Sequence, residues 1–144
     1  MRVTTQTSTS GSKGAFAAKT SGIHVVVRPV YLPEQSDPDA GRYVWAYTVT
    51  IDNGGAGTVQ LRDRSWTIVD ATGRTEHVTG PGVVGEQPVM RPGERFEYTS
   101  GCPLPTPSGF MSGHYTMVRE DGSTFEVAIP AFSLDRPDRP RTLN

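Results

Sequence analysis

The stretch Tyr43-Val44-Trp45-Ala46-Tyr47-Thr48-Val49-Thr50-Ile51 decides the fold that we expect for this chain of 144 residues. Its odd-numbered positions are all aromatic or β-branched apolar residues, and its even-numbered positions are mostly small or hydroxylated. Successive side chains of a β-strand point to opposite faces of a sheet, so this alternation predicts a strand with one buried face. The segment is the clearest central strand of the chain.

Comparable alternation predicts further short strands on both sides of this segment. They are expected over residues 23–28, 59–69, 76–79, 96–99, 114–117 and 125–129. Between Leu61 and Trp66 the apolar positions change from odd to even numbers, which predicts a β-bulge near residues 63–65. The proline-rich residues 102–109 are expected to cross over one end of the molecule. About seven strands without an amphipathic helix predict an all-β sandwich.

Aromatic residues at apolar positions are expected to supply most of the core. Burying one such side chain removes about 150–250 Å² from water, at roughly 25 cal/mol per Å². The main contributors to stability are therefore predicted to be Trp45, Trp66, Phe96 and Phe125.

The sequence predicts one domain with two loose ends. A chain of 144 residues is near the usual size of a single domain. Residues 1–20 are rich in Ser, Thr, Gly and Ala and are expected to form a flexible arm. Residues 136–144 combine charge with proline and are expected to form a flexible tail. The β-sandwich should therefore occupy residues 21–135.

Composition narrows the partners and the location that we expect. Fourteen basic and fifteen acidic residues give a net charge of -1, whereas proteins that neutralise phosphates need a basic surplus. We therefore expect no nucleic-acid partner, and no segment has the apolar length of a membrane span. The single cysteine, Cys102, and the lack of a secretory signal favour the cytoplasm. An uncovered sheet edge leaves both a monomer and a homodimer open.

The most distinctive motif is Gly80-Pro81-Gly82-Val83-Val84-Gly85-Glu86-Gln87-Pro88, called here the glycine loop, which contains a Gly-x-Gly-x-x-Gly pattern. Glycine permits a left-handed backbone and close approach to main-chain N–H groups, as in pyrophosphate-binding loops. In dinucleotide-binding folds such a loop opens a helix, but Gln87-Pro88 follows here and we expect no helix.

Three interpretations of the glycine loop stay open. It is a tight connection between strands, a backbone nest for a polyphosphate or other anion, or a contact surface for a partner protein. In a contact surface the glycines would allow close backbone approach, the valines would give apolar contact, and the carboxylate would give polar registration. The candidate binding residues are Gly80, Gly82, Val83, Val84, Gly85 and Glu86.

No residue pattern points to catalysis or to a metal site. No two of His24, His77 and His114 lie at a metal-binding spacing. The chain has no Gly-x-Ser-x-Gly motif, and nothing in the spacing forces two carboxylates together. Arg62 and Arg64 are expected to point outward; they could hold an anion beside the loop, although a solvated strand face is the simpler interpretation. We therefore name no catalytic residue, no metal ligand and no cofactor.

Several segments make the chain resemble the ApaG family of small bacterial proteins. They are Gly82-Val83-Val84-Gly85-Glu86-Gln87-Pro88, Pro92-Gly93-Glu94, Phe96-Glu97-Tyr98-Thr99-Ser100-Gly101, Gly109-Phe110-Met111-Ser112-Gly113-His114-Tyr115 and Ile129-Pro130-Ala131-Phe132-Ser133-Leu134. The resemblance spans about residues 22–137 and implies an immunoglobulin-like or fibronectin type III-like β-sandwich. Family members look like accessory proteins associated with cobalt and magnesium tolerance, and in some F-box proteins the domain resembles a recognition module. This chain departs from the family pattern at Pro81, where an acidic residue is expected.

Two hypotheses of different classes follow. The first is a non-enzymatic accessory or binding protein of the ApaG type, which recognises a partner protein or a small anion through the glycine loop. The resemblance links this hypothesis to cobalt and magnesium tolerance. The alternative is a hydrolase or binder of pyrophosphate or dinucleoside polyphosphates. A hydrolase would need a metal or a clustered acid–base pair near the loop.

Overall fold

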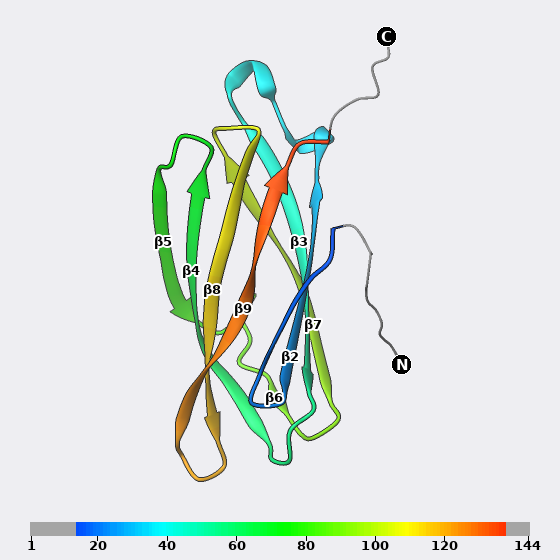
Figure 1. The fold of residues 1–144 in the computed structure, drawn as a ribbon, viewed down its shortest axis with the longest axis vertical. Helices are drawn as coiled ribbons and strands as arrows, with labels where there is room; N and C mark the ends of the chain where they lie inside the picture. The colour runs from blue at the N-terminus through cyan, green and yellow to red at the C-terminus, as the bar shows by residue number, and fades with distance from the viewer. Residues whose placement is uncertain (1–13, 138–144) are drawn as a thin grey trace.

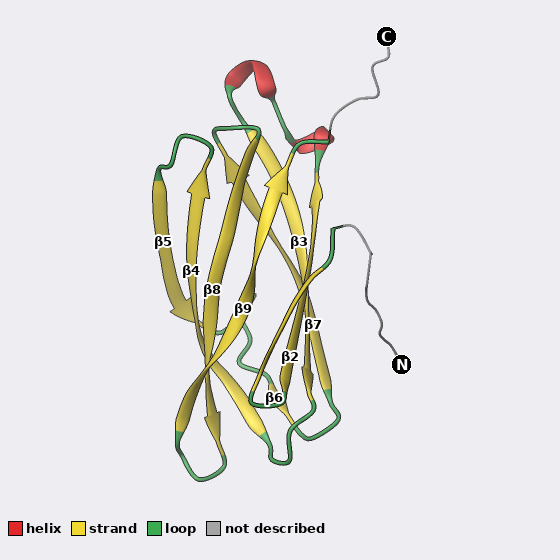
Figure 2. Cartoon of the chain, in the orientation of Figure 1, coloured by secondary structure: helices red, strands yellow, loops and turns green. Residues whose placement is uncertain are grey.

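The computed structural model describes residues 14–137, and within this range nine strands form two antiparallel sheets that pack face to face (Figures 1 and 2). One sheet has the order β1-β2-β3-β7 and the other has the order β5-β4-β8-β9, with β6 as a further partner of β4. The strands are β1 (Phe16–Thr20), β2 (Ile23–Tyr31), β3 (Tyr43–Asn53), β4 (Val59–Asp70), β5 (Thr75–Pro81), β6 (Val89–Met90), β7 (Arg95–Leu104), β8 (Ser108–Arg119) and β9 (Thr124–Asp135). The predicted all-β sandwich is confirmed, with nine strands in place of about seven.

The inner faces of the two sheets enclose one core, and β3 contributes to it as its alternation predicts. Trp45, Tyr47, Val49 and Ile51 are all at most 6% exposed. β3 lies between β2 and β7, where Val49 pairs with Val27 on one side and with Tyr98 on the other. A strand with neighbours on both sides and a buried face therefore anchors the four-stranded sheet.

The aromatic residues of the core differ in part from the prediction. Trp45 and Trp66 are buried, but Phe96 and Phe125 are only half-buried. Both phenylalanines are the second residue of their strands, so they lie near the ends of the sandwich where fewer side chains cover them. The buried aromatic residues Tyr98, Tyr115 and Phe132 are not among the main contributors predicted from the sequence. Tyr47 lies on the face of β3 that the alternation predicts to be buried.

β1 and β9 close one side of the sandwich, where the blue and orange strands lie together in Figure 1. The backbone N–H of Ala128 donates to the Thr20 hydroxyl at 3.1 Å, and the rings of Phe16 and Phe132 are 6.1 Å apart. The prediction of a flexible arm is therefore wrong for residues 16–20, because Phe16 contacts the core and β2 offers a pairing edge. Residues 1–13 of that arm and residues 138–144 of the predicted tail lie outside the described residues.

On the opposite side of the sandwich, the edge of the five-stranded sheet is made of two separate strands, β5 and β6, which both pair with β4. β5 pairs with β4 as far as Pro81 opposite Asp63, and β6 resumes the pairing with Val89 opposite Gln60. β4 has a register shift between Leu61 and Asp63, slightly before the predicted bulge position. The glycine loop therefore leaves the sheet where β4 bulges, and connects two halves of the same edge.

Two connections differ from the sequence prediction. The expected crossing over residues 102–109 is wrong in its extent: only residues 105–107 separate β7 from β8, because residues 102–104 continue β7 against β3. The polar loop before β3 contains two single-turn 3-10 helices, Pro33–Gln35 and Pro38–Ala40. Within residues 14–137 no helix has the length and apolar composition needed to span a membrane.

Candidate functional site

Residues 83–86 form the hairpin tip of the glycine loop. Val83 N donates to Glu86 O at 2.8 Å, and Glu86 N donates to Val83 O at 2.9 Å. The two central residues, Val84 and Gly85, have φ angles of 43° and 82°. Two consecutive residues with positive φ are characteristic of a type I′ turn, whose twist matches that of a β-hairpin. The tip is therefore a hydrogen-bonded structure with a defined shape.

The two valines of the tip have opposite environments. Val83 is 1% exposed and belongs to the hydrophobic core, whereas Val84 is 53% exposed. The left-handed region costs an L-residue about 1–2 kcal/mol, and it is most unusual for a β-branched residue. About half of Val84 is exposed, so burial offsets only part of that strain. Backbone strain of this kind concentrates at functional positions.

The glycines of the loop are required for different reasons. At Gly82 a Cβ atom would lie 2.3 Å from the carbonyl oxygen of Glu86, so only glycine fits there. At Gly80 a Cβ atom would lie 3.2–3.4 Å from the guanidinium of Arg64. Gly85 has open space around it and is favoured by its positive φ alone. The group that closely approaches the backbone of Gly82 is thus the Glu86 carbonyl of the same chain.

The backbone amides of the loop are largely occupied by internal hydrogen bonds. Gly82 N donates to Arg62 O at 2.8 Å, and the amides of Val83 and Glu86 bond each other's carbonyl groups. The loop continues into β6 and not into a helix. An anion nest needs successive free N–H groups. Among residues 82–86 only the amides of Val84 and Gly85 have no backbone acceptor in the described part of the chain, because those of Gly82, Val83 and Glu86 are already bonded.

Arg64 fixes the loop from the side of the core. Its Nη1 donates to Pro81 O at 2.9 Å and to Gly82 O at 2.8 Å. The expectation that Arg64 points outward is wrong, because the bulge after Leu61 reverses which positions of β4 face inward. Arg62 is exposed as expected, and its carbonyl accepts hydrogen bonds from Gly82 N and from the Gln87 side chain.

A hollow of about 310 Å³, called here the loop hollow, opens beside the hairpin tip and between the two sheets. β4 contributes Arg64 and Trp66 to its walls, and the other sheet contributes Tyr47, Tyr98 and Ser100. The remaining wall residues come from the glycine loop: Pro81, Val83, Val84 and Gly85. The structure thus brings three predicted site residues together with side chains that the sequence analysis did not assign to a site.

Tyr98, a wall residue of the loop hollow, shares a buried hydrogen bond with Tyr115. The hydroxyls of Tyr98 and Tyr115 are 2.6 Å apart, and the two residues are 7% and 0% exposed. Burial raises the pKa of each of these tyrosines, and it also raises the pKa of Tyr47. All three hydroxyls therefore stay protonated at neutral pH and can donate hydrogen bonds.

The other sequence candidates lie apart from the loop hollow. Glu86 is exposed and is not among the wall residues. The three histidines lie on three strands, β2, β5 and β8, and the described part of the chain has no group of three His, Cys, Asp or Glu side chains that could hold a metal ion. Burial raises the pKa of the Cys102 thiol to about 11, so little thiolate forms at neutral pH.

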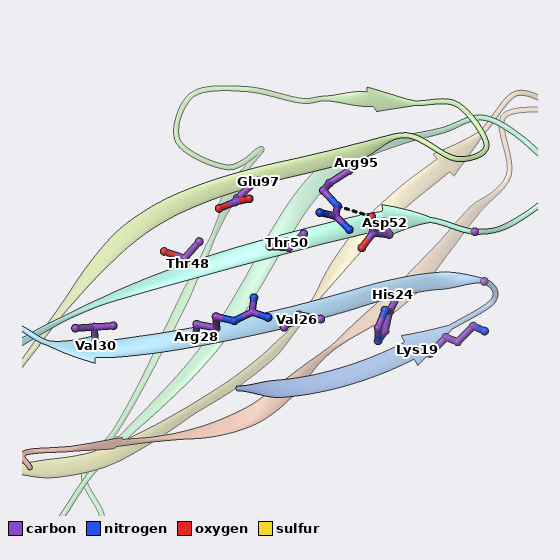
Figure 3. Close-up of a pocket in the computed structure, with 12 residues that line it drawn as sticks. Lys19, His24, Val26, Arg28, Val30, Thr48, Thr50, Asp52, Arg95 and Glu97 are labelled. Atoms are coloured by element: carbon purple, nitrogen blue, oxygen red, sulfur yellow. Dashed lines mark hydrogen bonds and ion pairs between the residues drawn. The ribbon is translucent and has the colours of Figure 1, made fainter. Parts of the chain in front are cut away.

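A larger hollow of about 820 Å³ lies on the outer face of the four-stranded sheet (Figure 3). Arg95 Nε donates to Asp52 Oδ1 at 2.7 Å on this face. The face also carries basic residues of β1 and β2 and a carboxylate of β7: Lys19, His24, Arg28 and Glu97. This outer face carries no signal of its own in the sequence, because alternation along β2 marks exposed positions without distinguishing a binding face from a solvated one.

The two packed antiparallel sheets make this chain an all-β sandwich protein. The glycine loop along one side is its candidate binding loop. The chain belongs to the ApaG family, whose domain matches residues 33–119. Protein ApaG of Rhodospirillum centenum is 63% identical over 122 residues, which cover 85% of this chain and 94% of that protein. Protein ApaG of Bradyrhizobium diazoefficiens is 58% identical over 129 residues, which cover 90% and 99%. A Bordetella pertussis crystal structure described as ApaA has a TM-score of 0.79 at 53% identity, and the match covers 81% of this chain and 95% of that one.

Proposed function

We propose that this chain is a non-catalytic binding protein that recognises a partner protein through the hairpin tip of the glycine loop. The observation that carries the proposal is the state of Val84, which is 53% exposed and held at a φ of 43°. The hydrogen bonds of the hairpin and the contacts of Arg64 fix this residue before any partner arrives. A pre-formed apolar tip loses little conformational freedom on binding, which favours affinity.

The hydrogen bonds of the loop favour a partner protein over a small anion held by the loop backbone. The amides of Gly82, Val83 and Glu86 already have acceptors. Binding an anion there would require those bonds to open, and the hairpin that positions Val84 would open with them. An apolar contact on Val84 requires no such change.

A photo-reactive amino acid at position 84 tests this proposal in living cells. We expect a covalent adduct with one partner protein at position 84. We expect no such adduct at position 30, where Val30 is 58% exposed on the outer face of the four-stranded sheet. With the purified partner, Val84→Asp should weaken binding by at least about tenfold, because a charge replaces an apolar contact, while Val30→Asp should leave it unchanged. Adducts at position 30 alone would move the site to the outer face.

The link to cobalt and magnesium tolerance is the finer part of this proposal and stays a prediction. A bacterial strain that lacks its own family member should regain growth in raised cobalt when it carries this chain. The chain with Val84→Asp should fail to restore growth if tolerance depends on the partner. Full restoration of growth by the Val84→Asp chain would show that cobalt tolerance does not depend on the hairpin tip.

The alternative, action on pyrophosphate or a dinucleoside polyphosphate, is tested with the purified chain. Each ligand is titrated with and without magnesium, while thermal unfolding and phosphate release are followed. A ligand at a hundredfold its Kd stabilises the folded state by about 2.7 kcal/mol. A shift of this size or turnover would favour the alternative over the partner-binding proposal.

A further inference from the structure

One wall residue of the loop hollow is buried and has a side-chain hydrogen-bond donor with no acceptor among the described residues. Trp66 is 3% exposed and lines the hollow, and its indole Nε1–H makes no hydrogen bond within residues 14–137. The other tryptophan differs, because Trp45 Nε1 donates to Asp135 O at 3.1 Å. Buried indole N–H groups usually have an acceptor, so the state of Trp66 points to a ligand that supplies one.

The tyrosine hydroxyls add a second donor to the same hollow. The Tyr98 and Tyr115 hydroxyls carry two hydrogens, and only one of them can lie between the two oxygens. Tyr98 lines the hollow, whereas Tyr115 does not. When Tyr115 donates to Tyr98, the hydrogen of Tyr98 is therefore free to serve an acceptor in the hollow.

The charge of the hollow is positive and is not balanced within its walls. Arg64 is the cation among the wall residues, and those residues include no Asp or Glu. Its Nη1 already bonds two loop carbonyls, while the guanidinium has further N–H groups. The walls of one hollow thus include residues with indole, hydroxyl and guanidinium donors and no carboxylate, which is complementary to an acceptor of single negative charge.

We propose that the loop hollow binds the carboxylate of a glutamate or aspartate side chain of the partner protein, while an adjacent apolar residue of that partner packs on Val84. This inference rests on the proposed partner-binding function. A carboxylate matches one guanidinium in charge, and its two oxygens suit the guanidinium and a buried N–H or O–H donor. A phosphate carries more charge and commonly relies on backbone amides, but those of Gly82, Val83 and Glu86 have acceptors on β4 or within the loop.

Nuclear magnetic resonance of the full ¹⁵N-labelled chain tests the carboxylate site with a built-in control. The probes are the tripeptides acetyl-Val-Glu-Val-amide and acetyl-Val-Gln-Val-amide, and inorganic phosphate. The acidic tripeptide should move the Trp66 indole N–H signal and the Arg64 Nε–H signal along a saturable curve. The Trp45 indole signal should stay in place because its hydrogen bond to Asp135 lies outside the hollow. The Gln tripeptide should bind at least about tenfold more weakly, because hydrogen bonds to a charged acceptor are the stronger ones.

Two variants show whether the buried hydroxyl takes part. Tyr98→Phe removes the hydroxyl and keeps the ring, so it should weaken binding of the acidic tripeptide by about tenfold. Tyr31→Phe is the matched control, because Tyr31 packs on Trp45 and does not line the hollow. An unchanged Trp45 indole signal shows that Tyr98→Phe keeps its fold. An unchanged Trp66 indole signal in the free protein shows the same for Tyr31→Phe, because Tyr31 is in direct contact with Trp45.

Each contrary result overturns the carboxylate site. Equal binding of the two tripeptides would remove the charge requirement, and equal or tighter binding of phosphate would make the hollow a general anion site. If the Trp66 signal does not move, the indole N–H of Trp66 has solvent as its acceptor and not a carboxylate. These titrations contain no partner protein, so their failure leaves the cross-linking test at position 84 unaffected. Cross-linking can fail in turn while the Trp66 signal still titrates.

Discussion

The loop hollow and the outer face of the four-stranded sheet are both hollowed surfaces, but they satisfy their polar groups in different ways. On the outer face, polar side chains pair with each other in reach of water: Arg95 with Asp52 at 2.7 Å, and Thr48 with Thr99 at 2.8 Å. Among the walls of the loop hollow, Trp66 is buried and its indole N–H has no acceptor within residues 14–137, and Tyr98 is buried and has a hydrogen to spare when Tyr115 donates to it. The larger hollow is therefore a solvated strand face, and the smaller one has the features of a binding site. Size alone does not separate them.

The largest expected difference between the two regions concerns glycine. Gly82→Ala should destabilise the fold by about 3 kcal/mol, since it combines a positive φ with a clash against the Glu86 carbonyl. Gly101→Ala lies on the outer side of β7, where a Cβ atom meets Trp45 O at an ordinary 3.6 Å. It should change stability by less than about 1 kcal/mol. Urea unfolding measures both, and equal losses would show that the loop is not specially constrained.

A second contrast compares two hydroxyl–hydroxyl hydrogen bonds. Tyr98→Phe leaves the Tyr115 hydroxyl buried without its partner, so it should cost about 2 kcal/mol. Thr99→Val removes an exposed hydroxyl that water replaces at Thr48, so it should cost less than about 0.5 kcal/mol. Chemical unfolding of the two variants gives the comparison. A loss at Thr99→Val as large as that at Tyr98→Phe would mean that the outer face is drier than its exposure indicates.

Much of the fold could be predicted from the sequence because its signals are local. The alternation along Tyr43–Ile51 identified the buried face of the central strand, and the phase change after Leu61 identified the bulge to within a few residues. β1 was missed because its role depends on a distant partner: Phe16 packs on Phe132. A two-residue strand such as β6 carries no periodicity, so its pairing to β4 is visible only in three dimensions.

The candidate site could be predicted only in its backbone part. The glycine spacing marked the loop, but the same spacing suits an anion nest and a hairpin. Only the hydrogen bonds accepted by Arg62 O and Glu86 O show that the tip is a hairpin. Arg64 was misplaced because a bulge inverts the side of every later residue of its strand. Trp66 and Tyr98 lie far apart in the sequence, and they meet through the packing of two sheets.

A third contrast makes one substitution in both regions and expects opposite signs. Val84→Asn should stabilise the fold by about 1 kcal/mol, because Asn-Gly is the preferred pair for a type I′ turn. Val30→Asn lies in β2, where asparagine is disfavoured, and should destabilise by a few tenths of a kcal/mol. Thermal unfolding gives the sign of each change. Partner affinity should fall for Val84→Asn in spite of its greater stability. A rise in both stability and partner affinity would show that binding does not need the strained valine.

The smallest expected effect belongs to the ion pair on the outer face. The side chains of Arg95 and Asp52 are 37% and 32% exposed, so water screens their attraction. Asp52→Asn should therefore cost no more than about 0.5 kcal/mol at low ionic strength, and that cost should vanish in about 1 M salt. The cost of Tyr98→Phe should persist in the same salt, because it arises from a buried neutral hydroxyl. A loss above about 2 kcal/mol for Asp52→Asn would place a desolvated charge pair on the outer face. The two regions would then no longer differ in the way that supports the loop hollow as the proposed binding site.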